Sequence, residues 1–199
     1  MRSDTEKLPG ACRGPNRATV VDQARQARER LAPYLRPSPL VLSEPLSSRT
    51  PGRVWLKLET QQPTNSFKVR PALNGMLRHL DEARRRGVVT SSSGNYAQAV
   101  AYAARELDVD AQIVMMRKSS PFKVERTRQL GGEVVFCENT FQDRWKTVFR
   151  IQDETGRLLL HPFDSEGTIA GDGTIGLELV EQIESDFCAV VPVSGGGLI

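Results

Sequence analysis

Segments with helical spacing of apolar residues alternate along the chain with short β-branched runs. Apolar residues recur at helical intervals between Ala18 and Leu35, which predicts a helix with one buried face. We also expect extended segments at 39–42 and 54–59, and a helix at 69–86 with Gly87 as its C-cap. Beyond that glycine the alternation is regular, with strands expected at 88–90, 111–116, 133–136, 158–160 and 189–193, and helices at 97–107, 121–130, 141–153 and 175–183. This order indicates an α/β fold with open parallel sheets and helices on both faces.

Three loops in this pattern carry candidate chemistry. Lys68 follows the turn-forming segment 62–67 and lies where a helix is expected to begin. A lysine amine becomes nucleophilic when burial or nearby positive charge lowers its pKa. The serine-rich loop 91–96 joins a strand to a helix, and the loop 194–198 contains three successive glycines. Both loops are typical of backbone that binds an anion such as a phosphate group. A further glycine-rich stretch, 169–174, is expected to be a turn leading into the helix at 175–183.

The composition argues against several classes of protein. The 199 residues include 27 Lys and Arg against 24 Asp and Glu, and a net charge of +3 is too small to indicate a nucleic-acid partner. No segment approaches the ~20 apolar residues of a membrane span, and 1–17 reads as a disordered leader. Cys12, Cys137 and Cys188 are far apart, so we predict no disulfide framework, no metal site and a cytoplasmic protein. Cys137 and Cys188 flank apolar runs and are expected in the core.

Six motifs together resemble one enzyme family. In chain order, starting at Pro63, they are PTNSFKVR, SSSGNYAQAVAYAAR, GGEVV, HPFD, AGDGTIGLEL and VPVSGGGL. They are similar to motifs of the pyridoxal-phosphate enzymes of the tryptophan-synthase-β fold type (fold type II), and within it to the threonine/serine dehydratase and serine racemase family. The resemblance covers about 18–199, nearly the whole chain, which argues against a chance match.

The resemblance implies a cofactor and a set of site residues. Pyridoxal 5'-phosphate would bind covalently to Lys68, which would also act as the base at the substrate Cα. Phe67 would pack near the cofactor ring, and Asn95 would hydrogen-bond the phenolic oxygen of the cofactor. The phosphate group would be held by Ser194, Gly195, Gly196, Gly197 and Leu198. The carboxylate of a small amino-acid substrate would be surrounded by Ser92, Ser93, Asn95 and Tyr96.

The implied activity is that of an ammonia-lyase (dehydratase), which converts a β-hydroxy amino acid such as L-threonine or L-serine to a 2-keto acid and ammonia. Ser93 also leaves a racemase open, because in similar racemases a serine at this place exchanges a proton with the face of Cα opposite the lysine. Ser93 can equally well satisfy a loop N–H group. The residues are also compatible with a β-replacing synthase of the same fold and with a non-catalytic binding module.

Four positions depart from the family pattern. Asn65 stands where glycine is usual, and asparagine tolerates a positive φ better than most residues. Pro71 replaces a glycine in the first turn of the expected helix. Tyr96 stands where histidine is common, and Ser194 replaces the first of four glycines.

By the same resemblance the protein has two domains. A larger cofactor domain would comprise 18–86 and 165–199, and a smaller inserted domain would comprise 87–164. By this resemblance, members of the family are longer than these 199 residues. We therefore expect a C-terminally truncated two-domain enzyme with impaired turnover. The full-length relatives are expected to be homodimers, and neither a nucleic acid nor a membrane is an expected partner.

Overall fold

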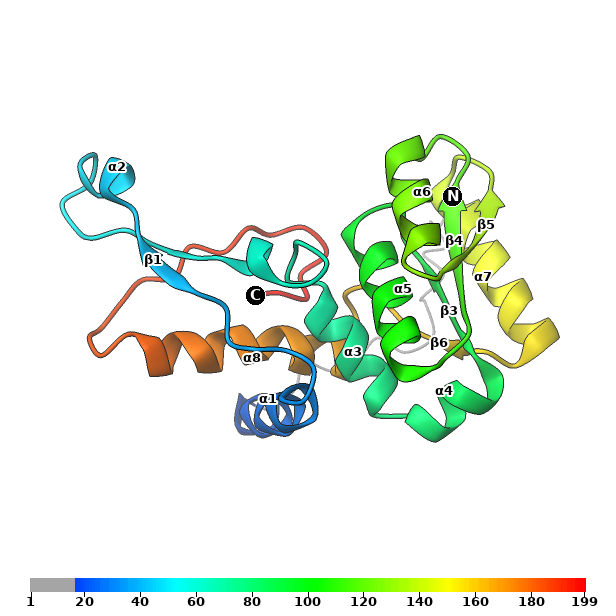
Figure 1. The fold of residues 1–199 in the computed structure, drawn as a ribbon, viewed down its shortest axis with the longest axis horizontal. Coiled ribbons are helices and arrows are strands. Elements are labelled where there is room, and N and C mark those ends of the chain that lie inside the picture. The colour runs from blue at the N-terminus through cyan, green and yellow to red at the C-terminus, as the bar shows by residue number, and fades with distance from the viewer. Residues whose placement is uncertain (1–16) are drawn as a thin grey trace, which may run out of the picture.

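The computed structural model describes residues 17–199, which form two sheets and the helices around them (Figure 1). The strands are β1 (Leu40–Leu42), β2 (Trp55–Lys57), β3 (Val88–Ser91), β4 (Ala111–Met116), β5 (Glu133–Cys137) and β6 (Leu158–Leu159). The helices are α1 (Arg17–Leu31), α2 (Glu44–Ser47), α3 (Val69–Leu77), α4 (Leu80–Arg86), α5 (Asn95–Leu107), α6 (Pro121–Gln129), α7 (Phe141–Thr155) and α8 (Glu166–Gln182), with a 3₁₀ turn, η1 (Glu59–Gln61). The expected leader, 1–17, lies outside the described residues except for Arg17, which begins α1.

The main sheet has four parallel strands in the order β5-β4-β3-β6. Successive side chains of a strand point to opposite faces. Val88 and Ile113 accordingly lie in the core shared with α5 and α6, whereas their neighbours Val89 and Val114 lie in a second core under α7. Because both faces are covered, the strands read as nearly continuous apolar runs. The predicted α/β fold, with a parallel sheet between helices, is confirmed.

A second group of elements lies beside this sheet. Strands β1 and β2 pair antiparallel, and helices α1, α3 and α8 pack on one another. Figure 1 shows these elements on one side of the molecule, the four-stranded sheet with α4–α7 on the other, and α3 between them. The proposed boundaries of a larger and a smaller domain stay a prediction.

The prediction of a glycine-rich turn at 169–174 is wrong, because these residues lie inside α8. The helix begins after Ser165, whose side chain accepts a hydrogen bond from the Thr168 N–H at 3.2 Å. The glycines serve close packing instead. A Cβ atom at Gly171 would lie 2.7 Å from Pro71 Cα in α3, a distance that no side chain can occupy.

The single helix predicted at 69–86 is two helices. His79 has φ −135° and ψ 38°, which is not helical geometry, and it separates α3 from α4. The change of direction places Ala83 of α4 in the core of the main sheet. Neither glycine nor proline lies at the break, so the sequence carries no signal for it. Gly87 ends α4 with φ 72°, as expected for a C-cap glycine.

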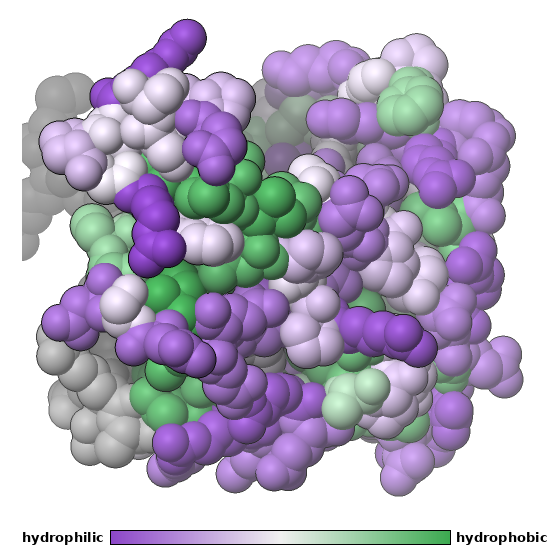
Figure 2. Space-filling model, turned by 60° about the vertical axis from the view of Figure 1, so that its left-hand side comes forward, coloured by the Kyte–Doolittle hydropathy of each residue, from purple (hydrophilic) through white to green (hydrophobic). Residues whose placement is uncertain are grey.

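The buried strand predicted at 189–193 is also wrong. Val190 and Val193 are 94% and 63% exposed, and in the described part of the chain no strand pairs with this segment. A strand needs a neighbour for its N–H and C=O groups, so unpaired backbone stays irregular and faces water. Figure 2 shows hydrophobic surface on the side of the molecule that carries β1 and β2, where Val41, Trp55 and Leu56 are also exposed.

The cysteines divide between core and surface. Cys137 is buried as predicted, but Cys188 is exposed, because the segment that contains it is not covered by other elements. No helix within residues 17–199 combines the length and apolar character that crossing a membrane requires.

Candidate active site

Lys68 lies at the N-cap position of α3 with its amine half-buried. Its Nζ donates a hydrogen bond to the Pro162 carbonyl oxygen at 3.0 Å, and lies 4.7 Å from the ring centroid of Phe67 and 5.9 Å from that of Tyr96. Burial lowers the pKa of Lys68, and the Asp172 carboxylate opposes this shift. The amine is therefore partly desolvated, as a nucleophilic lysine requires.

The segment before Lys68 folds as the sequence predicts. Asn65 has φ 56° and closes a turn with a hydrogen bond from its N–H to the Gln62 carbonyl at 2.7 Å. Pro71 is the third residue of α3, where its missing N–H would have had no partner within the helix. Both departures from the family pattern are thus compatible with a helix that begins directly after Lys68.

The glycine-rich loop 194–198 comes close to the same place. A Cβ atom at Gly195 would lie 2.6 Å from Phe163 Cγ, and one at Gly197 would lie 2.7 Å from the Phe163 carbonyl oxygen. Phe163 directly follows Pro162, the hydrogen-bond partner of Lys68. The lysine and the loop, more than 120 residues apart in sequence, therefore lie next to adjacent residues of one dipeptide. Within residues 17–199, the N–H groups of 194–198 make no backbone hydrogen bond and stay open to an anion.

The serine-rich loop presents a different set of contacts. Ser92 Oγ accepts a hydrogen bond from the Gly94 N–H at 3.3 Å. Ser93 Oγ accepts hydrogen bonds from the Met116 N–H at 3.3 Å and from the Ser119 hydroxyl at 2.7 Å. Asn95 is exposed at the first turn of α5, and Tyr96 beside it is buried, which raises the pKa of its hydroxyl. The structure thus places the Lys68 amine over the rings of Phe67 and Tyr96. The substrate-binding roles of Ser92, Ser93, Asn95 and Tyr96 stay predictions.

Asp172 is a residue of this site that the sequence motifs do not single out. It lies in α8, is 2% exposed, and both of its carboxylate oxygens lack a hydrogen-bond partner. Burial raises its pKa to about 7, against the opposing effect of Lys68 and Arg70. The signal is hidden because the stretch AGDGT is typical of a turn. On a helix, an aspartate among small residues that pack against a neighbouring helix is itself buried.

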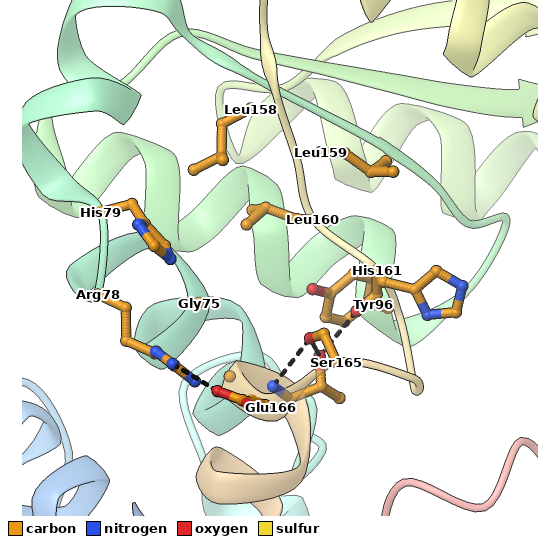
Figure 3. Close-up of a pocket in the computed structure, with 12 residues that line it drawn as sticks. Gly75, Arg78, His79, Tyr96, Leu158, Leu159, Leu160, His161, Ser165 and Glu166 are labelled. Atoms are coloured by element: carbon orange, nitrogen blue, oxygen red, sulfur yellow. Dashed lines mark hydrogen bonds and ion pairs between the residues drawn. The ribbon is translucent and has the colours of Figure 1, made fainter. Parts of the chain in front are cut away.

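A cavity of about 230 Å³ adjoins the site (Figure 3). It is lined by Gly75, Arg78 and His79 on one side and by Leu158–His161, Ser165–Thr168 and Tyr96 on the other. His161 Nδ1 accepts a hydrogen bond from the Asp164 N–H at 2.8 Å, and its ring stacks on Trp145 with centroids 5.0 Å apart. Burial lowers the pKa of His161, so this side chain is a neutral hydrogen-bonding residue at the end of β6. No group of three or more metal-ligand side chains gathers anywhere in 17–199.

The residues present fit pyridoxal phosphate. The cofactor has an aldehyde, an aromatic ring and a phosphate group. The site offers an amine with a lowered pKa at Lys68 and aromatic side chains at Phe67 and Tyr96. The open N–H groups of the glycine-rich loop complete the set as ligands for a phosphate.

Comparisons with known proteins give the same answer. A family model described as pyridoxal-phosphate dependent enzyme matches residues 31–199. The chain is 41% identical over 180 residues to an L-threonine ammonia-lyase of Thermotoga maritima. The aligned residues make up 90% of this chain and 45% of that protein. It is 37% identical over 182 residues to a serine racemase of Oryza sativa subsp. indica. The aligned residues make up 92% of this chain and 54% of that protein. The structure of maize serine racemase matches with a TM-score of 0.87 at 39% identity, covering 89% of this chain and 54% of that one.

The chain spans about half the length of the curated relatives that it matches. The match extends over both groups of elements in Figure 1 and over the lysine, serine and glycine motifs. This chain belongs to the pyridoxal-phosphate-dependent enzymes of fold type II, in the family of the threonine dehydratases and serine racemases.

Proposed function

We propose that this chain carries the lysine-bearing half of a pyridoxal-phosphate-dependent ammonia-lyase that acts on β-hydroxy amino acids such as L-threonine or L-serine. The observation that carries the proposal is that the half-buried Lys68 amine contacts Pro162 while the glycine-rich loop packs against the next residue, Phe163. The name of the relative from Thermotoga maritima, L-threonine ammonia-lyase, supports the reaction class. Since the chain spans about half of such relatives, we propose that turnover by the 199 residues alone is impaired.

Each side chain of the site has a defined part in this proposal. Bound pyridoxal phosphate supplies an electron sink that stabilises negative charge at the substrate Cα. Lys68 would hold the cofactor through its amine, and the freed amine would be the base at the substrate Cα. The N–H groups of 194–198 would hold the phosphate group, and Asn95, in the first turn of α5, would hydrogen-bond the phenolic oxygen. Phe67 and Tyr96 exclude water from the amine, which keeps its pKa low.

The test measures where the cofactor attaches. The purified chain is mixed with pyridoxal phosphate, reduced with borohydride and digested, and the modified lysine is identified by peptide mass spectrometry. We expect attachment at residue 68, its loss in Lys68→Ala, and its retention in Lys146→Ala, which removes an exposed lysine of α7. Attachment spread over surface lysines, and equal in Lys68→Ala, would overturn the proposal.

Ammonia release from L-threonine and L-serine tests the activity. We expect slow release that depends on Lys68, and robust turnover by the 199 residues would refute the proposed impairment. A non-catalytic binding module is the competing hypothesis from another class. Such a module would show neither cofactor attachment at Lys68 nor ammonia release. Its binding of a partner protein or a phosphate ligand would be the same in Lys68→Ala and wild type.

A racemase is the second candidate, favoured by the hydroxyl pair of Ser93 and Ser119. Their oxygens are 2.7 Å apart, and a hydroxyl linked to another hydroxyl can pass a proton on more easily than an isolated one. Chiral chromatography of the products from L-serine distinguishes the two reactions. A racemase would form D-serine and lose this product in Ser93→Ala, whereas a lyase would form pyruvate and ammonia only.

A further inference from the structure

The segment between β6 and α8 makes contact with both parts of the proposed cofactor site. The Pro162 carbonyl oxygen accepts a hydrogen bond from Lys68 Nζ at 3.0 Å, and Phe163 lies against Gly195 and Gly197 of the glycine-rich loop. The segment forms neither strand nor helix, and its proline has no N–H group to donate. Regular backbone pairing therefore does not hold these two residues in place.

The side chain of His161 closes the turn that contains them. Its Nδ1 accepts a hydrogen bond from the Asp164 N–H at 2.8 Å and a longer one from the Phe163 N–H at 3.4 Å. Within residues 17–199, neither of these N–H groups has a backbone carbonyl as its acceptor. The arrangement is that of an Asx turn, in which a side-chain acceptor bonds N–H groups that follow it closely in the chain.

The imidazole ring of His161 is itself held from two sides. It stacks on Trp145 of α7, with ring centroids 5.0 Å apart and planes inclined by 12°, and it meets Phe163 edge-on at 4.7 Å. Its backbone carbonyl accepts a hydrogen bond from the Thr168 hydroxyl of α8 at 2.7 Å. Burial lowers the pKa of His161, against the opposing effect of Asp164, so the ring is neutral and Nδ1 can accept. The acceptor is therefore fixed relative to α7 and α8.

We propose that His161 is a positioning residue of the cofactor site. Its Nδ1 holds the turn so that the Pro162 carbonyl faces the Lys68 amine while Phe163 faces the glycine-rich loop. The amine and the loop would bind two groups of the same cofactor molecule, its aldehyde and its phosphate. The placement of two adjacent residues thus sets how well both groups can be bound at once. This inference rests on the proposed function of Lys68 as the cofactor-binding amine.

Two substitutions separate the acceptor of His161 from its ring. His161→Asn keeps an acceptor at the same number of bonds from Cα, and asparagine is common in such turns, but the aromatic ring is lost. His161→Phe keeps a ring that can stack on Trp145 and loses the acceptor. The proposal predicts that His161→Asn behaves like wild type and that His161→Phe does not. A role in packing alone predicts the reverse.

The first measurement needs no cofactor. The carbonyl ¹³C chemical shift of Pro162, which responds to the hydrogen bond from Lys68, is compared between wild type and Lys68→Met. We expect a difference that is retained when both proteins also carry His161→Asn and is lost when both carry His161→Phe. Circular dichroism verifies that each variant is folded. The proposal is overturned if His161→Phe keeps the difference or if His161→Asn loses it.

A second measurement uses wild type alone and so does not depend on the folding of any variant. Scalar coupling between two ¹⁵N nuclei across a hydrogen bond shows directly which nitrogen accepts. We expect such a coupling between His161 Nδ1 and the amide nitrogen of Asp164, with the ring proton on Nε2. A protonated Nδ1 without this coupling at neutral pH would overturn the proposal.

Cofactor attachment distinguishes this proposal from the proposed function. Attachment to Lys68 is measured after borohydride reduction for pyridoxal phosphate and for pyridoxal, which lacks the phosphate group. Wild type should prefer pyridoxal phosphate, because 194–198 bind the phosphate. In His161→Phe we expect this preference to fall by about two- to tenfold, the effect of one lost hydrogen bond, whereas His161→Asn retains it.

Each outcome of that comparison has a definite meaning. An unchanged preference in His161→Phe, even with less attachment of both aldehydes, would indicate a merely structural role and overturn the proposal. Attachment of neither aldehyde at Lys68 in wild type would refute the proposed function, and the Pro162 chemical shift would still decide whether His161 positions the carbonyl that Lys68 contacts.

Discussion

Replacing Glu178 by alanine tests the buried ionic cluster that joins α3 and α8. Glu178 accepts hydrogen bonds from Arg70 at 2.6 and 3.0 Å, from Lys57 at 2.5 Å and from the Ser38 N–H at 3.1 Å. Two cations and two anions, with Glu59 as the second anion, make the cluster neutral. The substitution leaves Arg70, whose side chain is 2% exposed, beside an excess positive charge.

The expected loss of stability follows from that burial. Removing one partner of a buried ion pair costs about 3–5 kcal/mol, because the remaining charge stays uncompensated. For a chain of this size each kcal/mol lowers the melting temperature by about 2–4 °C, so we expect a drop of about 6–20 °C. Glu181→Ala is the matched control: its side chain is 61% exposed and pairs with Arg28 at the surface. A surface pair contributes about 0–1 kcal/mol.

Urea unfolding followed by circular dichroism measures both variants at pH 7. The dependence on pH adds a second criterion. Burial alone would raise the pKa of Glu178, but the hydrogen bonds from Arg70 and Lys57 outweigh it and lower the pKa. Stabilisation by a carboxylate with a lowered pKa is present above its unfolded pKa of about 4.3 and is lost as the pH falls through the folded value. The difference between wild type and Glu178→Ala therefore shrinks in acid. Equal stability of Glu178→Ala and Glu181→Ala at pH 7 would refute this account of the cluster.

Three further substitutions or modifications have definite expected outcomes. Gly171→Ala places a methyl group 2.7 Å from a Cα atom of α3, and we expect urea unfolding to show a loss of about 1–3 kcal/mol of stability. Gly176→Ala in the same helix meets nothing within 4 Å and should gain about 0.5–1 kcal/mol. Similar effects of the two substitutions would contradict the packing of α8 on α3. Asp172 has a folded pKa raised to about 7, so its ionisation opposes folding as the pH rises from about 4 to 7; thermal melts of Asp172→Asn should gain on wild type over that range, and a constant difference would contradict the burial of this acid. Iodoacetamide should alkylate the exposed Cys188 rapidly and the buried Cys137, whose thiol pKa is raised by burial, only on unfolding, and equal rates would show that the segment around Cys188 is covered.

The regular part of the fold could be predicted from local pattern. Strand β4 coincides with the predicted 111–116, and β3, β5 and β6 differ from prediction by one residue at an end. These strands are short apolar runs bounded by turn residues, and β3 and most of β4 are buried, so local sequence and tertiary contacts agree. The failures lie where the two diverge. Glycines normally mark a turn, but in α8 they allow contact with Pro71 in α3.

The candidate site shows the same division. The motif around Lys68 and the glycine-rich loop could be found from sequence, because the spacing of such loops relative to strands is characteristic. Their convergence on Pro162 and Phe163 depends on how α3, β6 and the C-terminal segment pack, which no local pattern contains. Asp172 escapes prediction for a related reason: an acidic residue is normally assigned to the surface, and only the packing of α8 makes it buried.

The exposed segment 189–193 has a consequence for handling the protein. Its apolar side chains are exposed, and within residues 17–199 its backbone N–H and C=O groups pair with no strand. Such a segment can bind a second extended peptide by strand addition. We therefore expect the protein to aggregate at a lower concentration than a net charge of +3 alone would imply. Placing a lysine at Val190, which is 94% exposed, would act as a gatekeeper there without disturbing either core.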